Sequence, residues 1–347
     1  MTKTIGVLTG GGDCPGLNAV IRAVVRSGLK YDLETLGIRN GWQGLIDGDV
    51  EPLTDFSVTG ILPKGGTILG TSRTNPLKQT SDFQKIKSNI KKFGIHALVI
   101  IGGDGTLSAA RDMAQQGISV VGIPKTIDND ICGTDVTFGF DTAVSTVTEA
   151  IDRLHTTAES HHRIIVVEVM GRNVGWIAVM AGIAGGADEI LIPEVRCTMD
   201  GICKKLMARY NAGKKFSIVV IAEGTHLEDL GIPAVPENER DECGHEKFVG
   251  VGNILGKELE HRLGIETRVT ILGHVQRGGS PTAYDRILAT RFGVAAVKLV
   301  HAGDFGKMVA LQGNRIISIP LESAVNQLKK VDNEIYELAM IVTGGGK

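Results

Sequence analysis

Residues 97–106 read ALVIIGGDGT, an apolar run followed by a glycine-rich loop that carries one carboxylate. A short run of Val, Ile and Leu is typical of a strand that is buried on both faces, and such strands form parallel sheets covered by helices. The amphipathic stretch 106–116 follows the loop, and we expect it to be a helix capped by Thr106. The segment therefore predicts a strand–loop–helix unit of an α/β fold.

The same unit recurs along the chain. Apolar runs predict strands at 5–8, 97–101, 120–123, 164–169, 190–192, 217–221, 269–272 and 308–311. Amphipathic stretches predict helices at about 17–29, 106–116, 141–158, 173–185, 199–211, 252–263 and 284–301. The alternation predicts a doubly wound α/β fold, and 347 residues suffice for two sheets. Ligands of such folds bind beyond the carboxyl ends of the strands, so the strand-to-helix loops are the candidate sites.

Composition excludes several classes of protein. Hydrophobic residues make up 42% and charged residues 22% of the chain, which is typical of a globular protein and excludes intrinsic disorder. A net charge of -2 provides no general attraction to nucleic acid or acidic lipid, so neither is an expected partner. The longest uncharged run, 173–187, is too short to cross a bilayer. Five scattered cysteines without a CxxC pair are typical of reduced thiols in a cytoplasmic protein.

The stretch 226–250 differs from the rest because it holds two prolines and a long polar run. We interpret it as an exposed insertion rather than a binding element. Cys243 and His245 lie within it, but two possible ligands without a second pair are weak evidence for a metal site.

Two glycine-rich loops are candidate phosphate sites. The first, GGGDCPG at 10–16, lies between a predicted strand and a predicted helix, where backbone N–H groups can converge on an anion. Its spacing matches neither the dinucleotide GxGxxG pattern nor the Walker lysine loop. In the second, GGDGT at 102–106, Asp104 is placed to hold Mg²⁺, which prefers oxygen ligands. A purely structural turn is the alternative at both loops.

A third loop carries two carboxylates. PKTIDND at 124–130 follows the predicted strand 120–123 and offers Asp128 and Asp130, one as a candidate base and one as a supporting acid. A base that takes the proton of an attacking hydroxyl contributes about 10²–10⁴ in rate. A simple Asp/Asn-rich turn is the alternative here.

Arginines lie at the ends of predicted strands, where a guanidinium suits the oxygens of a phosphate group. They are Arg73, Arg163, Arg172, Arg268 and Arg277. Each alone is a surface charge on the simplest interpretation, but together they suggest phosphate clamps. With a magnesium holder and a candidate base, they supply what phosphoryl transfer requires. The sequence therefore predicts a kinase of a small phosphorylated molecule.

Five motifs in order, GGDCPGLNAVIRAVV, GGDGT, PKTIDND, VEVMGR and LGHVQRGGSP, resemble the 6-phosphofructokinase family over about 5–311. The resemblance implies two doubly wound Rossmann-like domains. Residues 1–140 plus about 276–325 would bind the phosphoryl donor, and 141–275 plus about 326–347 the sugar phosphate. It also implies Mg²⁺-dependent transfer of a phosphoryl group to the 1-hydroxyl of fructose 6-phosphate, giving fructose 1,6-bisphosphate in cytoplasmic glycolysis.

Roles carry over where the motifs match. The resemblance implies that Asp128 deprotonates the 1-hydroxyl with Asp130 nearby, that Asp104 binds Mg²⁺, and that Arg172 and the Gly12 backbone stabilise charge on the transferred group. Implied donor-binding residues are Gly12, Arg73, Thr74, Gly103, Asp104, Gly105 and Thr106. Implied sugar-phosphate residues are Thr126 (also catalytic), Asp128, Arg163, Met170, Gly171, Arg172, Glu223, Arg268, His274 and Arg277.

The resemblance also implies an assembly. In the family, Arg163 and Arg268 match arginines that reach in from a neighbouring subunit. A homo-oligomer, a tetramer or a dimer, with active sites shared between subunits would follow.

Gly105 and Lys125 give opposite indications about the donor. Glycine at the first position resembles ATP users, because a carboxylate there would repel and displace the nucleotide α-phosphate. Lysine at the second resembles the pyrophosphate-using lineage, in which an ammonium can pair with a phosphate leaving group. Gly105 governs whether ATP fits, so the prediction is ATP, with pyrophosphate as the alternative, in a lineage that combines both features.

Other interpretations remain open. A non-catalytic sensor of sugar phosphates or nucleotides would use the same fold, but Asp104, Asp128 and Arg172 are all present. A dinucleotide-dependent oxidoreductase would need the GxGxxG fingerprint, which is missing. At the family's effector site, Arg22, Arg26, Lys214 and Lys215 match basic positions, whereas Asp55 and His155 replace arginines. We therefore expect weak or absent regulation by nucleotide or phosphoenolpyruvate.

Overall fold

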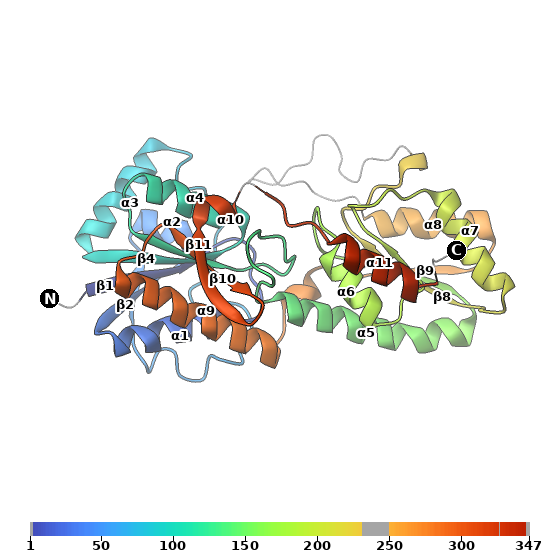
Figure 1. Ribbon diagram of the computed structural model, residues 1–347, viewed down its shortest axis with the longest axis horizontal. Coiled ribbons are helices and arrows are strands. Elements are labelled where there is room, and N and C mark those ends of the chain that lie inside the picture. Colours follow the sequence, from blue (N-terminus) through green and yellow to red (C-terminus); the bar gives the residue numbers. More distant parts are fainter. Residues whose placement is uncertain (1–2, 231–249, 326, 345–347) are drawn as a thin grey trace. The chain divides into compact units, whose positions relative to one another are not determined.

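The computed structural model describes residues 3–230, 250–325 and 327–344, and the chain divides into two compact units (Figure 1). Unit 1 comprises Met1–Thr142 and Arg277–Leu328, and unit 2 comprises Ala143–Gln276 and Lys329–Lys347. Most of the expected insertion at 226–250, including Cys243 and His245, lies outside the described residues.

Within the described residues, unit 1 is built on a seven-stranded sheet in the order β11-β10-β5-β4-β1-β2-β3. Its strands are β1 (Lys3–Thr9), β2 (Leu33–Ile38), β3 (Val50–Leu53), β4 (Ile95–Gly102), β5 (Val120–Pro124), β10 (Lys307–Gln312) and β11 (Arg315–Pro320). From β2 to β10 the neighbouring strands run parallel, and antiparallel β3 and β11 form the two edges. The apolar runs that predict β1, β4 and β5 are buried almost throughout, as strands covered on both faces must be.

Helices cover both faces of this sheet. They are α1 (Leu17–Lys30), α2 (Gly41–Asp47), α3 (Thr80–Lys92), α4 (Asp104–Gln115), α9 (Ala283–Ala302) and α10 (Leu321–Ala324). Figure 1 shows α1 and α9 side by side on one face and α2, α3, α4 and α10 on the other. The core under the second group includes Leu98, Ile100, Trp42, Ile86 and Leu107.

Unit 2 has a smaller sheet in the part of the chain that the structure describes, with four parallel strands in the order β7-β8-β6-β9. The strands are β6 (Ile164–Val169), β7 (Glu189–Leu191), β8 (Ser217–Ala222) and β9 (Thr267–Ile271). The helices are α5 (Phe140–His161, which begins in unit 1), α6 (Trp176–Ala184), α7 (Met199–Asn211), α8 (Val251–Leu263) and α11 (Asn333–Val342). Short 3-10 helices are η1 (Glu228–Leu230) and η2 (Gly273–Arg277). The predicted doubly wound α/β fold with two sheets is thus confirmed.

Two antiparallel edges depart from the predicted parallel sheet. β10 and β11 form a hairpin through Gly313-Asn314, and Gly313 has φ 56, a conformation that suits glycine. β2, β3 and β11 carry polar residues between apolar ones, so they lack the continuous apolar runs that identify buried strands. Helix α3 was not predicted either, because Ile86 is its one fully buried residue.

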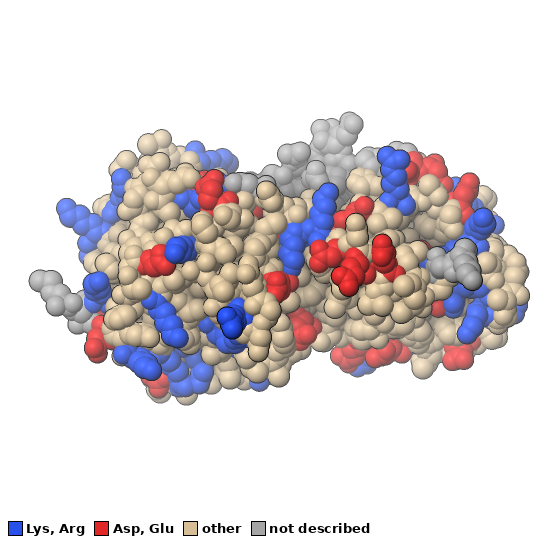
Figure 2. Space-filling model, viewed as in Figure 1, with Lys and Arg blue, Asp and Glu red and all other residues tan. Residues whose placement is uncertain are grey.

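None of the helices in the described ranges combines the length and the apolar composition that a bilayer span requires. On the face of the molecule shown in Figure 2, basic and acidic side chains occur on each unit.

A buried carboxylate ties the start of α9 to the start of α5 within unit 1. Asp285 is fully buried and accepts hydrogen bonds from the Thr142 backbone N–H (2.8 Å) and the Thr142 hydroxyl (2.5 Å). The Thr282 hydroxyl donates to Asp141 (2.6 Å) and accepts from the Asp285 N–H, so it caps α9. Burial raises the pKa of Asp285 from 3.8 to about 6, despite the bonds from Thr142, which lower it.

This pKa predicts a pH dependence of stability. Between pH 4 and 6 the folded chain holds a proton on Asp285 that the unfolded chain releases, so this group's contribution to stability falls as pH rises through that window. Asp285→Asn removes the ionisation, so between pH 5 and 7.5 the wild type should lose about 1 kcal/mol relative to this variant. Urea unfolding at both pH values measures the difference.

The control is Asp304→Asn, at an exposed partner of Lys307, which should change stability equally at both pH values. A constant difference between wild type and Asp285→Asn would show that Asp285 ionises normally.

Candidate functional site

Three predicted loops lie together at one edge of the unit 1 sheet. They follow β1, β4 and β5, which are neighbours and run parallel, so their carboxyl ends share that edge. Backbone bonds join the loops: the Gly10 N–H donates to Ile101 O, and the Lys125 N–H donates to Gly102 O, both at 2.9 Å.

The glycine turn after β1 is shaped by close contacts. Gly11 has φ 76, and its N–H donates to Ser72 O (2.9 Å). A Cβ on Gly12 would lie 2.6 Å from Nη1 of Arg277, so the guanidinium packs directly over this glycine. Arg277 also donates to Asp13 O at 3.3 Å. Arg277, a predicted sugar-phosphate residue, thus lies against the backbone of Gly12, a predicted donor-binding residue.

The loop after β4 leads straight into α4. Gly103 precedes the helix, and Asp104, its first residue, is exposed at the edge where the three loops meet. A Cβ on Gly105 would meet no described atom within 4 Å, so the structure leaves open space there for a ligand.

Thr106 does not cap α4 as we predicted, because Gly103 is the capping residue and no side chain bonds the first turn. Thr106 lies inside that turn, is buried, and packs where side chains on Gly10 or Gly102 would sit. Its size explains why both loops need glycine at these two positions.

Asp128 is buried in the loop after β5, with 4% of its surface exposed. Its backbone N–H donates to the Thr126 hydroxyl (3.0 Å), which lies 3.4 Å from Oδ2. The other oxygen, Oδ1, is buried and has no hydrogen-bond partner among the described residues. The loop is held in place because the Thr137 hydroxyl donates to Thr126 O (2.8 Å) and Asn129 adopts φ 53.

Lys125 links the loops after β5 and β1. Its side chain is 3% exposed, and Nζ donates to Gly12 O. Burial lowers the pKa of this ammonium group. The buried lysine side chain therefore connects the loop after β5 to the glycine turn.

Three further residues of these segments are Arg73, Thr74 and Cys14. Arg73 is exposed, and the Thr74 hydroxyl donates to Gln43 Oε1 at 3.2 Å. Cys14 is fully buried, and burial raises the pKa of its thiol to about 12, so it does not supply a thiolate nucleophile at neutral pH.

A second group of predicted residues lies at the carboxyl edge of the unit 2 sheet. Met170, Gly171 and Arg172 follow β6, Glu223 follows β8, and His274 follows β9. The Arg172 N–H donates to Glu223 Oε1 at 3.0 Å, with Arg172 at φ 52. Gly171 has φ 148, and a Cβ there would collide with the backbone at Val174.

One supporting residue was not predicted. Gln276, fully buried in η2, accepts a hydrogen bond from the Met170 N–H (3.2 Å) and donates to Gly273 O (3.0 Å). It thereby fixes the segment that carries His274 against the end of β6. The signal that could have identified Gln276 was its position in the LGHVQRGGSP motif, between His274 and Arg277.

Arg163 and Arg268 lie at the opposite edge of the same sheet. Arg163 precedes β6, and Arg268 is the second residue of the parallel strand β9. Both guanidinium groups pair with Glu266, Arg163 at 2.7 Å, and the bond from Arg163 lowers the pKa of Glu266. A six-residue strand spans about 20 Å. Within one unit, therefore, these two arginines do not meet the group around Arg172.

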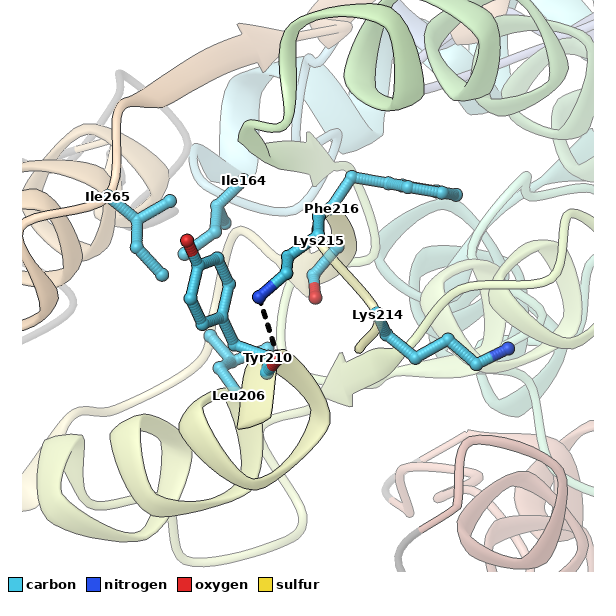
Figure 3. Close-up of a pocket in the computed structure, with 8 residues that line it drawn as sticks. Ile164, Leu206, Tyr210, Lys214, Lys215, Phe216 and Ile265 are labelled. Atoms are coloured by element: carbon cyan, nitrogen blue, oxygen red, sulfur yellow. Dashed lines mark hydrogen bonds between the residues drawn. The ribbon is translucent and has the colours of Figure 1, made fainter. Parts of the chain in front are cut away.

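Some of the effector-type positions contact other residues of the protein. In unit 1, Arg26 pairs with Asp55 at 2.7 Å. In unit 2, Lys214 and Lys215 line a small pocket with Tyr210 and Ile164 (Figure 3). Lys215 Nζ lies 3.9 Å from the centre of the Tyr210 ring and donates to Tyr210 O. The side chain of Lys214 points away from the Tyr210 ring (Figure 3).

The donor set at the unit 1 edge suits magnesium rather than a metal held by protein alone. Among the described residues, no three His, Cys, Asp or Glu side chains gather as a ligand cluster. Mg²⁺ is usually bound by one or two carboxylates together with water and substrate phosphates. The exposed carboxylate of Asp104, beside two glycine loops, fits that pattern.

Several known proteins resemble this chain over most of its length. Residues 4–300 match the family described as "PFK: Phosphofructokinase". The chain is 56% identical to the pyrophosphate–fructose 6-phosphate 1-phosphotransferase of Streptomyces coelicolor, over 96% of this chain and 97% of that protein. It is 52% identical to ATP-dependent 6-phosphofructokinase 3 of the same organism, over 97% and 99%. The phosphofructokinase structure from Saccharomyces cerevisiae superposes with a TM-score of 0.81 at 34% identity, over 99% of this chain and 46% of that chain.

Proposed function

The chain belongs to the phosphofructokinase family, and from this premise we propose that it transfers the terminal phosphoryl group of ATP to the 1-hydroxyl of fructose 6-phosphate. The observation that carries the chemistry is the buried Asp128 carboxylate with one unpartnered oxygen. It lies in a loop that Lys125 ties to the glycine turn.

Asp128 is the general base of the proposed reaction. Oδ1 accepts the proton of the 1-hydroxyl, while the Thr126 hydroxyl near Oδ2 keeps the carboxylate oriented. The sugar oxygen then attacks phosphorus, and the bond to the leaving phosphate breaks. The Gly12 N–H in unit 1 and the Arg172 guanidinium in unit 2 supply positive charge to the transferred group.

Asp104 would hold the Mg²⁺ that neutralises charge on the donor phosphates when bound. Gly103, Gly105, Thr106, Arg73 and Thr74 complete the proposed donor side in unit 1. Unit 2 supplies the sugar-phosphate side through Met170, Gly171, Glu223 and His274, with Arg277 of unit 1. In support of this assignment, Gly12 and Asp104 follow β1 and β4, and Met170, Glu223 and His274 follow β6, β8 and β9.

ATP is the proposed donor because Gly105 leaves open space at the start of α4. The Lys125 ammonium is bonded to Gly12 O, so the lysine has a role within the protein that does not require a phosphate leaving group. Pyrophosphate is the second candidate, since relatives of similar identity carry each name. The scattered cysteines favour the cytoplasm as the compartment.

A second copy of the chain would complete the site. Arg163 and Arg268 lie at the sheet edge opposite Arg172 and are half-buried or exposed there. We therefore propose a homo-oligomer, a dimer or a tetramer, in which these arginines bind the sugar phosphate of a neighbouring subunit.

Removing the base tests the mechanism. Asp128→Ser should lower kcat by about 10²–10⁴ because the hydroxyl loses its proton acceptor, while the affinity for fructose 6-phosphate changes little. A coupled assay of bisphosphate formation and a calorimetric titration with the sugar phosphate measure the two quantities. Asp112→Asn, on the surface of α4, is the control. A near-normal rate in Asp128→Ser would remove Asp128 as the base.

Substituting Gly105 tests the donor. Gly105→Asp should fold normally, since its Cβ meets no described atom, but should raise KM for ATP more than tenfold through repulsion of the phosphates. Initial rates with ATP and with pyrophosphate, each with Mg²⁺, compare the donors in wild type and variant. Wild-type turnover with pyrophosphate but not ATP would establish the second candidate instead.

Mixing defective subunits tests the shared site. Arg268→Ser should raise KM for fructose 6-phosphate about 10–100-fold, as expected for a lost charged hydrogen bond. Co-expressed Arg268→Ser and Asp128→Ser chains should regain activity at low fructose 6-phosphate, because some hybrid sites hold neither change. Recovery that never exceeds the sum of the separate variants would place both residues in one subunit's site.

A further inference from the structure

The peptide that joins Gly11 to Gly12 is held at one end and open at the other. Its carbonyl, Gly11 O, accepts a hydrogen bond of 2.6 Å from the Thr71 hydroxyl. Its N–H, on Gly12, makes no hydrogen bond to any residue in 3–230, 250–325 or 327–344. Three other backbone groups of this turn, Gly10 N–H, Gly11 N–H and Gly12 O, are hydrogen-bonded to the protein.

A trans peptide is planar, and its C=O and N–H point in opposite directions. A bond that fixes the direction of Gly11 O therefore also fixes the direction of the Gly12 N–H. Glycine on both sides gives this peptide unusual freedom to rotate, so the turn needs an external contact to hold it. A hydrogen bond to a carbonyl also polarises the peptide and strengthens its N–H as a donor.

Thr71 can hold the peptide because its own segment is fixed. The Gly70 carbonyl accepts a bond of 2.7 Å from the Thr9 hydroxyl, and the Ser72 carbonyl accepts from the Gly11 N–H. Upstream, the buried Asn18 side chain donates to Lys64 O and Gly65 O and accepts from the Ile68 N–H. The hydroxyl of Thr71 is thus presented to the turn from a segment with several anchors.

We infer that Thr71 is a positioning residue that aims the Gly12 N–H at the phosphoryl group in transfer. The inference rests on the proposed function in one respect, that this N–H meets the terminal phosphate of the donor. Thr71 touches neither substrate on this account; it acts through the peptide it holds. Its contribution should therefore appear in steps that involve the donor phosphate and not in the binding of the sugar phosphate.

Thr71→Val tests this, since valine keeps the shape of threonine and removes the hydroxyl. It should lower kcat/KM for the donor at least about tenfold, because a single oriented donor to a reacting oxyanion is worth about 10²–10³ when lost altogether. KM for fructose 6-phosphate should stay within twofold. Thr71→Ser keeps the hydroxyl and should restore most of the rate.

The matched control is Thr67→Val, in the same segment. The Thr67 hydroxyl lies 3.0 Å from that of Thr9 and accepts from the Leu69 N–H, and among the described residues no hydrogen bond joins it to Gly10, Gly11 or Gly12. Its loss should lower the melting temperature about as much as Thr71→Val and leave kcat/KM unchanged. Equal rate losses in both variants would mean that Thr71 acts only on stability, and the inference would fall.

A binding measurement separates this inference from the proposed function. Calorimetric titration with Mg²⁺ and the imido analogues of ATP and pyrophosphate requires no turnover. The analogue that binds wild type should bind Thr71→Val several-fold more weakly and Thr71→Ser normally. If wild type transfers phosphate from neither donor, the proposed function fails, and this titration still decides whether Thr71 orients the turn. Unchanged affinity together with unchanged rates, or binding of neither analogue to wild type, would overturn it.

Discussion

The parallel pairing of β1 with β4 and of β4 with β5 is the constraint on which the donor half of the site depends. Neighbouring parallel strands end at one edge, so the glycine turn, the GGDGT loop and the loop of Asp128 are brought together before any side chain contributes. Side chains then refine the arrangement. Thr106 fills the space beside Gly10 and Gly102, and the Lys125 ammonium donates to Gly12 O in the turn. These contacts hold the three loops against one another.

The fold could be predicted largely because its central strands are continuous apolar runs, and β6 was predicted with its observed bounds, 164–169. Elements such as β2 and α3 were not predicted, because they are partly exposed and alternate apolar with polar residues. The Gly313-Asn314 pair is a hairpin signal, but the prediction considered only alternating strands and helices and so missed the hairpin of β10 and β11.

The candidate site divides in the same way. Asp104, Asp128 and Gly12 could be named from motifs, because each lies in a short segment after a buried strand that can be recognised without knowledge of tertiary contacts. Thr71 and Gln276 could not, since a threonine or glutamine acquires its role only from the carbonyl or N–H opposite it, and that partner is distant in sequence. The separation of Arg268 from Arg172 needed the direction of β9, which depends on tertiary pairing.

Unit 2 is inserted between two parts of unit 1, and this has a consequence for how the chain is made. Helix α1 ends at Lys30, and α9, the helix that packs along it, begins at Ala283. During synthesis α9, β10 and β11 therefore emerge after the inserted unit, so the part of the sheet face beneath α9 stays uncovered until then. Contacts so distant in sequence slow folding and expose the waiting surface to aggregation. The apolar face of the unit 1 sheet is thus completed only when about the last fifth of the polypeptide has been made.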